Sequence, residues 1–407
     1  MQAFSILHFQ FFMGVIRLEL YIDVDYESLN KFGEELCGDK VEVLRNNESV
    51  IVVLSDGLGS GVKANILATM TIKIIGTLMM NGAPIEEAVE TIASTLPVCN
   101  ERGLAYSTFT ILQVFNSGEA YLVEFDNPSA FFMRRGRNID IERTSREIGG
   151  KLIQESRFRV QPEDMFVMVS DGVVHAGINK TLNLGWQWEN VKEYIQRTYR
   201  SDLSARGIAK LLMSVCDNLY MQKPGDDTTV VAVKTRKHVH ADVMVGPPVD
   251  AGDDAQVVDK FIHGEGKKVV CGGTTSQIVS RELGRKIIAN FNYFNPAVPP
   301  TAEIDGIDLT TEGVLTIGKS LEYIKKCMAS DSTMQDFLVL KKQDGASRLA
   351  KVLMEDCTSI HFYVGRAMNP AHQNPDFPLD LSIKLNLVEE MSKCLKNMGK
   401  RVVVEYY

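Results

Sequence analysis

Three aspartates in the first half of the chain each adjoin an apolar run of strand type. Asp56 directly follows VIVVLS (50–55), Asp171 directly follows MFVMVS (165–170), and Asp226 shortly precedes TTVVAVK (228–234). If these runs are neighbouring strands of a sheet, their carboxylates gather at a shared edge. Crowded carboxylates repel one another unless a cation neutralises them, and hard divalent cations such as Mg²⁺ and Mn²⁺ prefer oxygen ligands. The pattern therefore predicts a metal site.

The glycines around the first aspartate fit this interpretation. Gly57 lets the backbone approach a cation closely and offers its carbonyl as a ligand, and Gly59 and Gly61 keep the turn that follows open. The alternative is that each Asp-Gly is an ordinary turn after a strand. Its occurrence beside three separate strands favours the metal site.

Hydrophobic periodicity indicates which elements must position these residues. Two helices are expected at 63–80 and 84–96, and a third carries apolar residues in register over 208–219. Further strands are expected at 106–115, 119–125 and 129–133. Strands joined by hairpins, together with paired helices, predict an α+β layered sandwich. The second half reads β-α-β, with strands at 267–271, 361–366 and 401–407 and a helix from about 276, which predicts a smaller α/β domain with a mostly parallel sheet.

Composition limits the classes of protein that fit. A chain of 407 residues suggests two or three domains, and its net charge of −8 argues against nucleic-acid binding through bulk positive charge. We expect a first domain at 13–236, a linker at 237–250 and a second domain at 251–407.

The cysteines and the first residues bear on the compartment. The seven cysteines form no CxxC pair, which argues against a disulfide framework or a zinc ribbon and fits a reducing compartment. The apolar start lacks the features of a signal peptide, and Met13 is an alternative start of translation, with 1–12 then not translated. These features predict a cytoplasmic protein without a membrane span.

A series of motifs along the first half resembles the metal-dependent protein phosphatases (the protein phosphatase 2C-like, or PPM, family), and specifically their SpoIIE-like bacterial branch. The resemblance runs from about Gly33 to Val233 and rests on the order and spacing of motifs that are weak one by one. They are Gly38-Asp39, Ser55-Asp56-Gly57-Leu58-Gly59-Ser60-Gly61, Ser107-Thr108, Asn127-Pro128, Gln161-Pro162-Glu163-Asp164, Ser170-Asp171-Gly172-Val173 and Asp226-Asp227-Thr228-Thr229-Val230.

The resemblance implies a fold and a set of site residues. The fold is an αββα four-layer sandwich, with two Mn²⁺ or Mg²⁺ ions at the sheet edge. Asp56 would bridge the ions, the Gly57 carbonyl would bind one of them, and Asp171 and Asp226 would complete the other shell. Asp39 aligns with the early acidic motif as a direct or water-mediated ligand, so the implied catalytic residues are Asp39, Asp56 and Asp171. Asp227 is the alternative to Asp226.

The implied reaction is hydrolysis of phosphoserine or phosphothreonine by an activated water. The branch implies a phosphorylated regulatory protein as the substrate, and homodimer formation as one means of control. One departure concerns Leu58, because eukaryotic members often carry a histidine there as a candidate general acid. His175 is a candidate replacement, although an ordinary loop role fits it as well. The rival interpretations are a non-catalytic phosphatase-like scaffold and a hydrolase of small phosphorylated metabolites.

The second half contains Cys271-Gly272-Gly273-Thr274-Thr275 between an expected strand and helix. Free N–H groups and hydroxyls at Gly272, Gly273, Thr274 and Thr275 could hold a small anionic ligand, and the alternative is a helix start with glycines for close packing. The segment lacks the lysine of a P-loop and the full GxGxxG of a dinucleotide site. A regulatory or ligand-binding role for this domain is the expectation.

Overall fold

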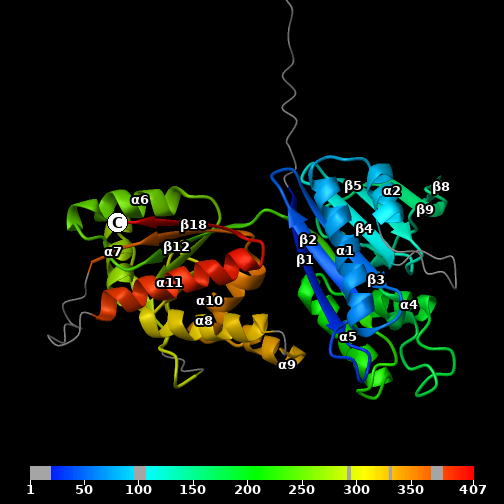
Figure 1. Cartoon of the computed structure of the whole chain (residues 1–407). Helices are drawn as coiled ribbons and strands as arrows, with labels where there is room; N and C mark the ends of the chain where they lie inside the picture. The colour runs from blue at the N-terminus through cyan, green and yellow to red at the C-terminus, as the bar shows by residue number, and fades with distance from the viewer. Residues whose placement is uncertain (1–19, 96–106, 291–294, 330–331, 368–378) are drawn as a thin grey trace, which may run out of the picture.

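The computed structural model describes residues 20–95, 107–290, 295–329, 332–367 and 379–407. Its described elements form two lobes that lie side by side (Figure 1). Three expectations lie outside the described residues: those on the alternative start at Met13, on residues 1–12, and on Cys99. The other six cysteines are free thiols, as expected.

The first lobe contains two antiparallel sheets. In the described part of the chain, one sheet has the order β1-β11-β10-β6-β7 and the other has the order β2-β3-β4-β5-β9-β8. The strands of the first sheet are β1 (Leu20–Leu29), β6 (Phe131–Arg134), β7 (Arg137–Asn138), β10 (Met165–Val169) and β11 (Thr228–Lys237). Those of the second are β2 (Asp39–Arg45), β3 (Ser49–Gly57), β4 (Ser107–Phe115), β5 (Glu119–Phe125), β8 (Thr144–Ile148) and β9 (Lys151–Arg159).

Helices cover the outer faces of both sheets. The helices of this lobe are α1 (Gly61–Met80), α2 (Ile85–Thr95), α3 (Asp171–Val174), α4 (Trp188–Thr198) and α5 (Ala205–Leu219). The strands alternate their side chains between two apolar layers: Val52, Leu112 and Phe166 pack between the sheets, while Ile51 and Ile111 pack under α1 and α2. This four-layer αββα sandwich is the fold class that the sequence predicts.

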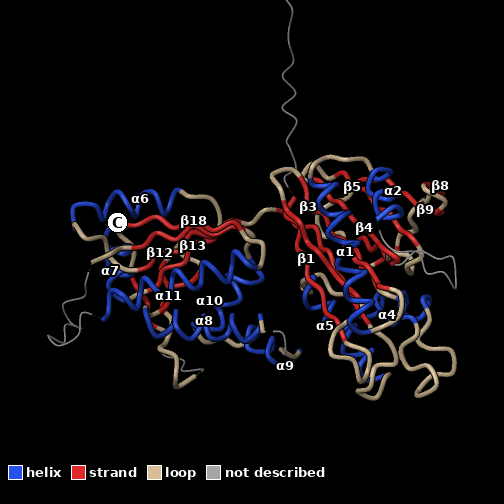
Figure 2. The backbone as a smooth tube through the Cα atoms, in the orientation of Figure 1, coloured by secondary structure: helices blue, strands red, loops and turns tan. Residues whose placement is uncertain are grey.

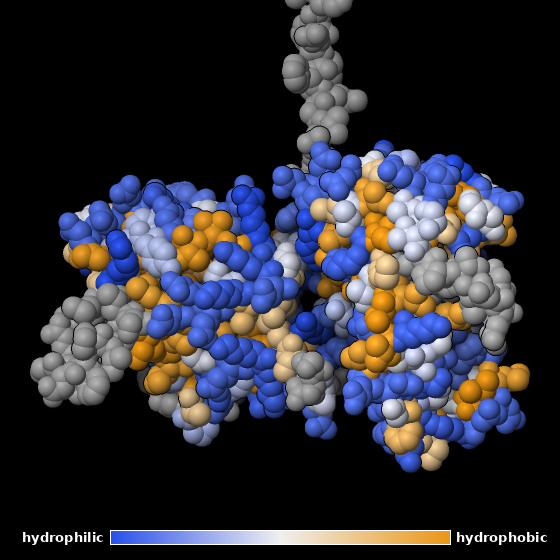
Figure 3. Space-filling model, in the orientation of Figure 1, coloured by the Kyte–Doolittle hydropathy of each residue, from blue (hydrophilic) through white to orange (hydrophobic). Residues whose placement is uncertain are grey.

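α1 is the one helix among the described residues that is long and apolar enough to cross a membrane, and a core helix passes the same test. Its buried face, which includes Leu67 and Ile75, packs in the apolar layer on the second sheet. Its other face exposes Val62, Ile66 and Met70, and hydrophobic residues are visible over this part of the lobe (Figure 3).

The second lobe is a three-layer α/β domain. Its described strands are ordered β14-β15-β16-β13-β12-β17-β18, and the pairs from β16 to β18 are parallel, as the sequence predicts. The strands are β12 (His240–Val245), β13 (Lys267–Cys271), β14 (Ile287–Ala289), β15 (Ala302–Ile304), β16 (Leu309–Thr311), β17 (Ser359–Val364) and β18 (Arg401–Tyr406).

Helices lie on both faces of this sheet (Figure 2). They are α6 (Asp254–His263), α7 (Gly273–Leu283), α8 (Val314–Met328), α9 (Met334–Phe337), α10 (Gly345–Lys351) and α11 (Leu379–Asn397), with short turns η1 (Ala251–Asp253), η2 (Leu338–Lys341) and η3 (Val352–Asp356). A large apolar layer that includes Ile317, Leu349 and Val388 fills one face, and a smaller one around Phe261 and Val279 fills the other.

The expected linker at 237–250 is corrected by the structure. Residues 240–245 form β12, the strand between β13 and β17 in the second sheet. Only His238 and Val239 separate it from β11, and the backbone N–H of Val239 donates to the Thr358 hydroxyl at 2.9 Å. The Gly-Pro-Pro that suggested a linker lies just after this buried strand, at 246–248, and therefore marks its end.

Candidate metal centre

The aspartates predicted from the sequence come together at one end of the first lobe. Asp39 begins β2 and lies opposite Asp56, near the end of β3, in the antiparallel register. Asp171 opens α3 directly after β10. Asp226 and Asp227 immediately precede β11, the strand that pairs with β10. Strand ends from both sheets thus place five carboxylates around one region.

Burial and mutual repulsion raise the pKa of three of these carboxyls. The pKa of Asp56 is raised to about 9, mainly by burial and then by the charges of Asp39, Asp171 and Asp226. Burial raises the pKa of Asp39 to about 7, with Asp227 and Asp171 adding to the rise. The pKa of Asp226 is raised by burial and by Asp171. Without a cation, the site thus favours protonated carboxyls.

Two of the aspartates have buried oxygens that lack a hydrogen-bond partner. Both carboxylate oxygens of Asp39 and Oδ2 of Asp227 are of this kind. Such atoms are costly unless something else satisfies them, and a divalent cation with oxygen preference would do so. Together with the crowding of negative charge, these atoms show that the residues present fit a metal centre.

Gly57 allows the close approach of backbone that the sequence predicts. A Cβ on Gly57 would lie 2.0 Å from the carbonyl oxygen of Ala64 in α1, so no other residue fits without a shift of the helix. Gly172, after Asp171, is equally constrained, since its Cβ would lie 2.1 Å from the carbonyl oxygen of Asp227. Both Asp-Gly pairs are therefore packed against neighbouring backbone, which an isolated surface turn does not require.

The two consecutive aspartates before β11 differ in their surroundings. Asp226 is partly exposed, with Oδ1 3.9 Å from Nζ of Lys31. Asp227 is buried, and its Oδ1 accepts a hydrogen bond of 3.0 Å from the backbone N–H of Lys31. Asp226 acts on the pKa of Asp56, whereas Asp227 acts on that of Asp39. The sequence treats these two residues as alternatives, yet each of them lies beside a different member of the group.

The aspartates surround a region and do not meet at one point. Among the described residues, one group of three or more ligand-type side chains has all its ligand atoms within 4.8 Å of one another, and it lies in the second lobe. Among the residues that the structure describes in the first lobe, no three carboxylates converge so closely.

The flanking motifs support the site indirectly. Thr108 on β4 pairs with Asp56, and its hydroxyl donates to Asn127 Oδ1 at 2.5 Å.

Beyond the aspartates lies an open cavity of about 480 Å³ lined by residues that include Ser129, Arg143, His175 and Trp188. His175 Nδ1 lies 3.9 Å from Asp171 Oδ2, while Leu58 is partly exposed beside Gly57. Sequence reasoning singled out His175 but missed Arg143 and Trp188, which carry no motif signal.

The segment predicted as a ligand site forms the turn from β13 into the start of α7. Gly272 adopts a φ of 121°, its N–H donates to the Thr311 carbonyl, and Thr275 is buried. A Cβ on Gly273 would meet open space. An anion at Gly272, Gly273, Thr274 and Thr275 stays a prediction.

A sandwich of two antiparallel sheets between helix layers, with aspartates gathered at one edge, is the arrangement that the resemblance to the protein phosphatase 2C-like family implies. The family model of Stage II sporulation protein E (SpoIIE) matches residues 46–236, from just before β3 to the end of β11. The match takes in most of the first lobe, and the second lobe lies beyond it.

Solved structures similar to this chain include several phosphatase domains. The phosphatase domain of SpoIIE from Bacillus subtilis is 19% identical, with 54% of this chain and 94% of that chain covered and a TM-score of 0.42. RsbX in complex with magnesium is 16% identical, with 53% and 95% covered and a TM-score of 0.40. The RsbU and RsbW domains of a Mycobacterium tuberculosis protein are 14% identical, with 59% and 68% covered and a TM-score of 0.44. No curated protein matches the chain.

Proposed function

We propose that this chain hydrolyses phosphoserine or phosphothreonine on a regulatory protein in the bacterial cytoplasm. The observation that carries the proposal is the group of five aspartates at one edge of the first lobe, where the pKa of Asp39, Asp56 and Asp226 is raised and buried oxygens of Asp39 and Asp227 lack a hydrogen-bond partner. The family model of SpoIIE matches this part of the chain. The free thiols among the described cysteines are in keeping with a reducing compartment. The substrate class follows from the family rather than from a contact in the structure.

Two Mn²⁺ or Mg²⁺ ions would be held by Asp56, the Gly57 carbonyl, Asp171 and Asp226. When bound, such ions supply an activated water and offset the charge of the phosphoryl oxygens. Asp56 is suited to a position shared by both ions, because the charges of Asp39, Asp171 and Asp226 all raise its pKa and therefore all act on its carboxyl. Asp39 and Asp227 form the more buried side of the site.

The remaining residues of the site orient the aspartates and border the space for a substrate. The hydroxyl of Tyr220, just after α5, donates to the Gly172 carbonyl at 2.7 Å and so fixes the turn after Asp171. The cavity beyond His175 has room for part of a phosphorylated loop or peptide. Among the ionisable residues that line the cavity, His175 is the nearest in sequence to Asp171. Its imidazole would hold a proton near the leaving group of the substrate.

The proposal is tested by hydrolysis of p-nitrophenyl phosphate with and without Mn²⁺. We expect turnover that depends on Mn²⁺ and that falls at least about 100-fold in Asp171→Asn, because the charge stabilisation of the transition state is lost. Asp202→Asn is the matched control, since Asp202 is exposed and pairs only with its neighbour Arg200. Absence of metal-dependent turnover in the wild type would contradict the proposal.

The substrate class needs a second measurement. Phosphopeptides and small phosphate esters are compared at equal concentration with the Mn²⁺-loaded wild type. A kcat/KM higher for phosphoserine and phosphothreonine peptides supports a protein substrate. A preference for small esters would instead assign the chain to the hydrolases of phosphorylated metabolites.

A further inference from the structure

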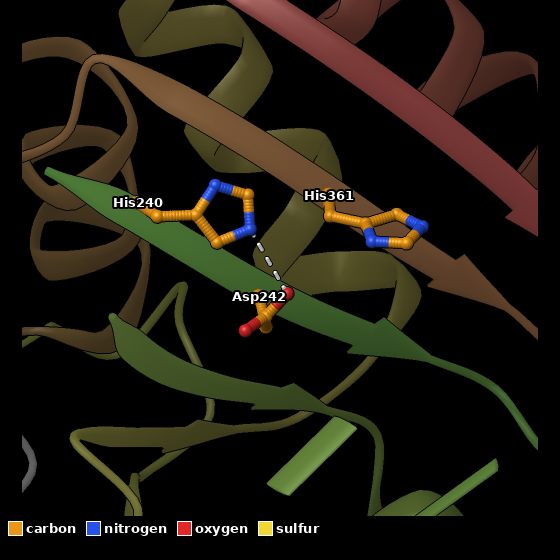
Figure 4. Close-up of side chains that lie close together, drawn as sticks. All are labelled: His240, Asp242 and His361. Carbon is orange, nitrogen blue, oxygen red and sulfur yellow. Dashed lines mark hydrogen bonds and ion pairs between the residues drawn. The ribbon is translucent and has the colours of Figure 1, made fainter. Parts of the chain in front are cut away.

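A second group of ligand-type side chains lies in the other lobe. His240, Asp242 and His361 each offer one ligand atom, and these atoms all lie within 4.8 Å of one another. Figure 4 shows the two imidazoles on either side of the Asp242 carboxylate, on the adjacent strands β12 and β17. The family match ends before this lobe, so the known phosphatase centre does not account for the group.

The register of the parallel sheet brings these residues together. Asp242 on β12 pairs with Lys268 on β13 and with His361 on β17, which gives one row across three neighbouring strands. His240 lies two residues before Asp242 and therefore points to the same face of the sheet. Because neighbouring strands are about 4.8 Å apart, side chains in such a row are close enough to share an ion.

Both histidines have their second ring nitrogen occupied by a partner. Nδ1 of His240 lies 2.9 Å from the Ser359 hydroxyl, which leaves Nε2 facing Asp242 Oδ1 at 3.1 Å. Nε2 of His361 lies 3.3 Å from Glu405 Oε2 on β18, and one ring nitrogen faces the Asp242 side (Figure 4). Metal-bound histidines typically contact a carboxylate or hydroxyl through the other nitrogen in this way.

Asp242 is held in a fixed orientation. It is buried, and its Oδ2 receives the Lys268 ammonium at 2.6 Å, while the same ammonium donates to the Gly264 carbonyl at 2.7 Å. Lys268 thus leaves Oδ1 as the oxygen directed at the histidines. The positive charge of Lys268 also balances that of Asp242, which predicts a lower affinity than a site with an unpaired carboxylate would have.

The simpler explanation is a His240–Asp242 ion pair with a packed neighbour. That pair accounts for His240 and Asp242, and Glu405 accounts for Nε2 of His361, but neither contact accounts for the His361 ring nitrogen on the Asp242 side. An ion held by all three side chains would give His361 a function within the group and would bridge the strands that carry them.

We propose that His240, Asp242 and His361 bind one divalent transition-metal ion of the Zn²⁺ type. Two imidazoles and one carboxylate suit Zn²⁺ and similar first-row ions, whereas Mg²⁺ and Ca²⁺ prefer sites made of oxygen. Three protein ligands leave at least one position of a tetrahedral ion open to water. The proposal is independent of the function assigned to the first lobe.

The test is zinc binding by the full-length protein, with the phosphatase centre disabled by Asp56→Asn and Asp171→Asn. Zn²⁺ is titrated against a chromophoric chelator, and the zinc X-ray absorption spectrum reports the number of imidazole ligands. We expect one zinc per chain with two imidazoles, and more than 100-fold weaker binding after His361→Ala or Asp242→Asn. Glu405→Gln neutralises the carboxylate that contacts Nε2 of His361, and with it the ion pair to Lys260, and is expected to weaken zinc binding by about 10- to 100-fold.

His263→Ala is the matched control, because His263 is an exposed histidine beside Asp259 in the same lobe. It is expected to keep wild-type zinc affinity. Since Asp242 is buried, the thermal midpoint of each variant is measured without zinc; the zinc-induced rise in that midpoint should disappear in His361→Ala. In the otherwise wild-type protein, His361→Ala should leave Mn²⁺-dependent phosphatase turnover unchanged. Equal zinc affinity in the wild-type site, His361→Ala and His263→Ala would overturn the proposal, as would a spectrum without imidazole.

Discussion

At the scale of single residues, the site is a balance between charge and burial. Asp39 and Asp227 are almost fully buried, and yet some of their oxygens have no hydrogen-bond partner. A core made for stability alone avoids such groups, because each unsatisfied polar atom costs free energy. The first lobe therefore gives up stability at this edge, and bound cations would restore it.

This balance predicts how the stability of the metal-free protein depends on pH. The pKa of Asp56 is about 9 in the folded protein and near 3.8 in the unfolded chain, so the folded state holds a proton that the unfolded state loses. The free energy of unfolding should therefore fall as the pH rises from about 4 to about 9. Urea unfolding at pH 6 and pH 9, with a chelator present, measures the fall.

The matching variant is Asp56→Asn, which cannot ionise. Its free energy of unfolding should decrease less between pH 6 and pH 9 than that of the wild type. Asp202→Asn should retain the wild-type dependence, because Asp202 is exposed and its pKa is lowered by Arg200. An unchanged pH dependence in Asp56→Asn would show that other groups cause the fall.

The residues of the centre could be predicted from sequence because each follows or precedes an apolar strand. The prediction of Asp56, Asp171 and Asp226 required only that pattern and the assumption that their strands are neighbours. The cavity residues Arg143 and Trp188 could not be found in this way, since they lie on segments whose position depends on tertiary packing. The group around Asp242 was missed as well, because His-x-Asp on one strand gains its partner His361 only through the parallel register.

At the scale of elements, short connections between helix ends and strand ends fix the site. α5 ends beside the turn that contains Gly172, and the Tyr220 side chain is almost completely buried there. Its hydroxyl is thus the link between a core helix and the loop of Asp171. The position of the loop depends on α5 even though α5 contributes no carboxylate.

We expect Tyr220→Phe to lower the free energy of unfolding by about 1–3 kcal/mol, because the Gly172 carbonyl loses a buried hydrogen bond. Turnover of p-nitrophenyl phosphate should fall as well. Tyr199→Phe is the control, since the Tyr199 hydroxyl makes only a long contact of 3.4 Å to the Glu163 carbonyl. Denaturant unfolding and steady-state kinetics measure both effects; equal behaviour of the two variants would refute the role of this link.

Strands whose residues are almost all buried could be predicted from the sequence, whereas strands that mix buried and exposed residues could not. β5 and β13 coincide with their predicted ranges because each has a continuous apolar run and all but its first residue is buried. β9 alternates buried and exposed residues with charges in between, and β2 is only partly buried, so neither gave a clear signal. β12 was mistaken for a linker because Gly-Pro-Pro directly follows it.

At the scale of the whole molecule, a small set of polar contacts joins the lobes. Arg206 on α5 pairs with Asp25 on β1 and donates from Nη1 to the Cys327 carbonyl of the second lobe at 2.9 Å. Lys210, one turn further along α5, donates to the Ser332 carbonyl at 2.7 Å. A cavity of about 400 Å³ lies between the lobes, lined by both, at the hollow seen in Figure 3.

Arg206→Ala should loosen this arrangement. It removes a charged hydrogen bond between the lobes and leaves Asp25 without its partner, so we expect a loss of about 1.5–3 kcal/mol in the free energy of unfolding. The radius of gyration from small-angle scattering should rise. Arg200→Ala is the control, because Arg200 is exposed and pairs only with Asp202. A wild-type radius in Arg206→Ala would mean that the other contacts suffice to hold the lobes.

The near-continuity of β11 and β12 separates the two proposed ion sites by a definite length of chain. Asp227 precedes one end of β11, and His240 begins β12 beyond its other end. At about 3.3 Å per residue, the intervening strand spans roughly 40 Å. Dissolved salt screens charges over about 8 Å at physiological ionic strength, so an ion in one lobe exerts no direct field on the other. Any influence of one ion on the other must therefore travel as a mechanical displacement, through the strand or through the contacts of Arg206 and Lys210 between the lobes. The part carried by the strand should persist at high salt.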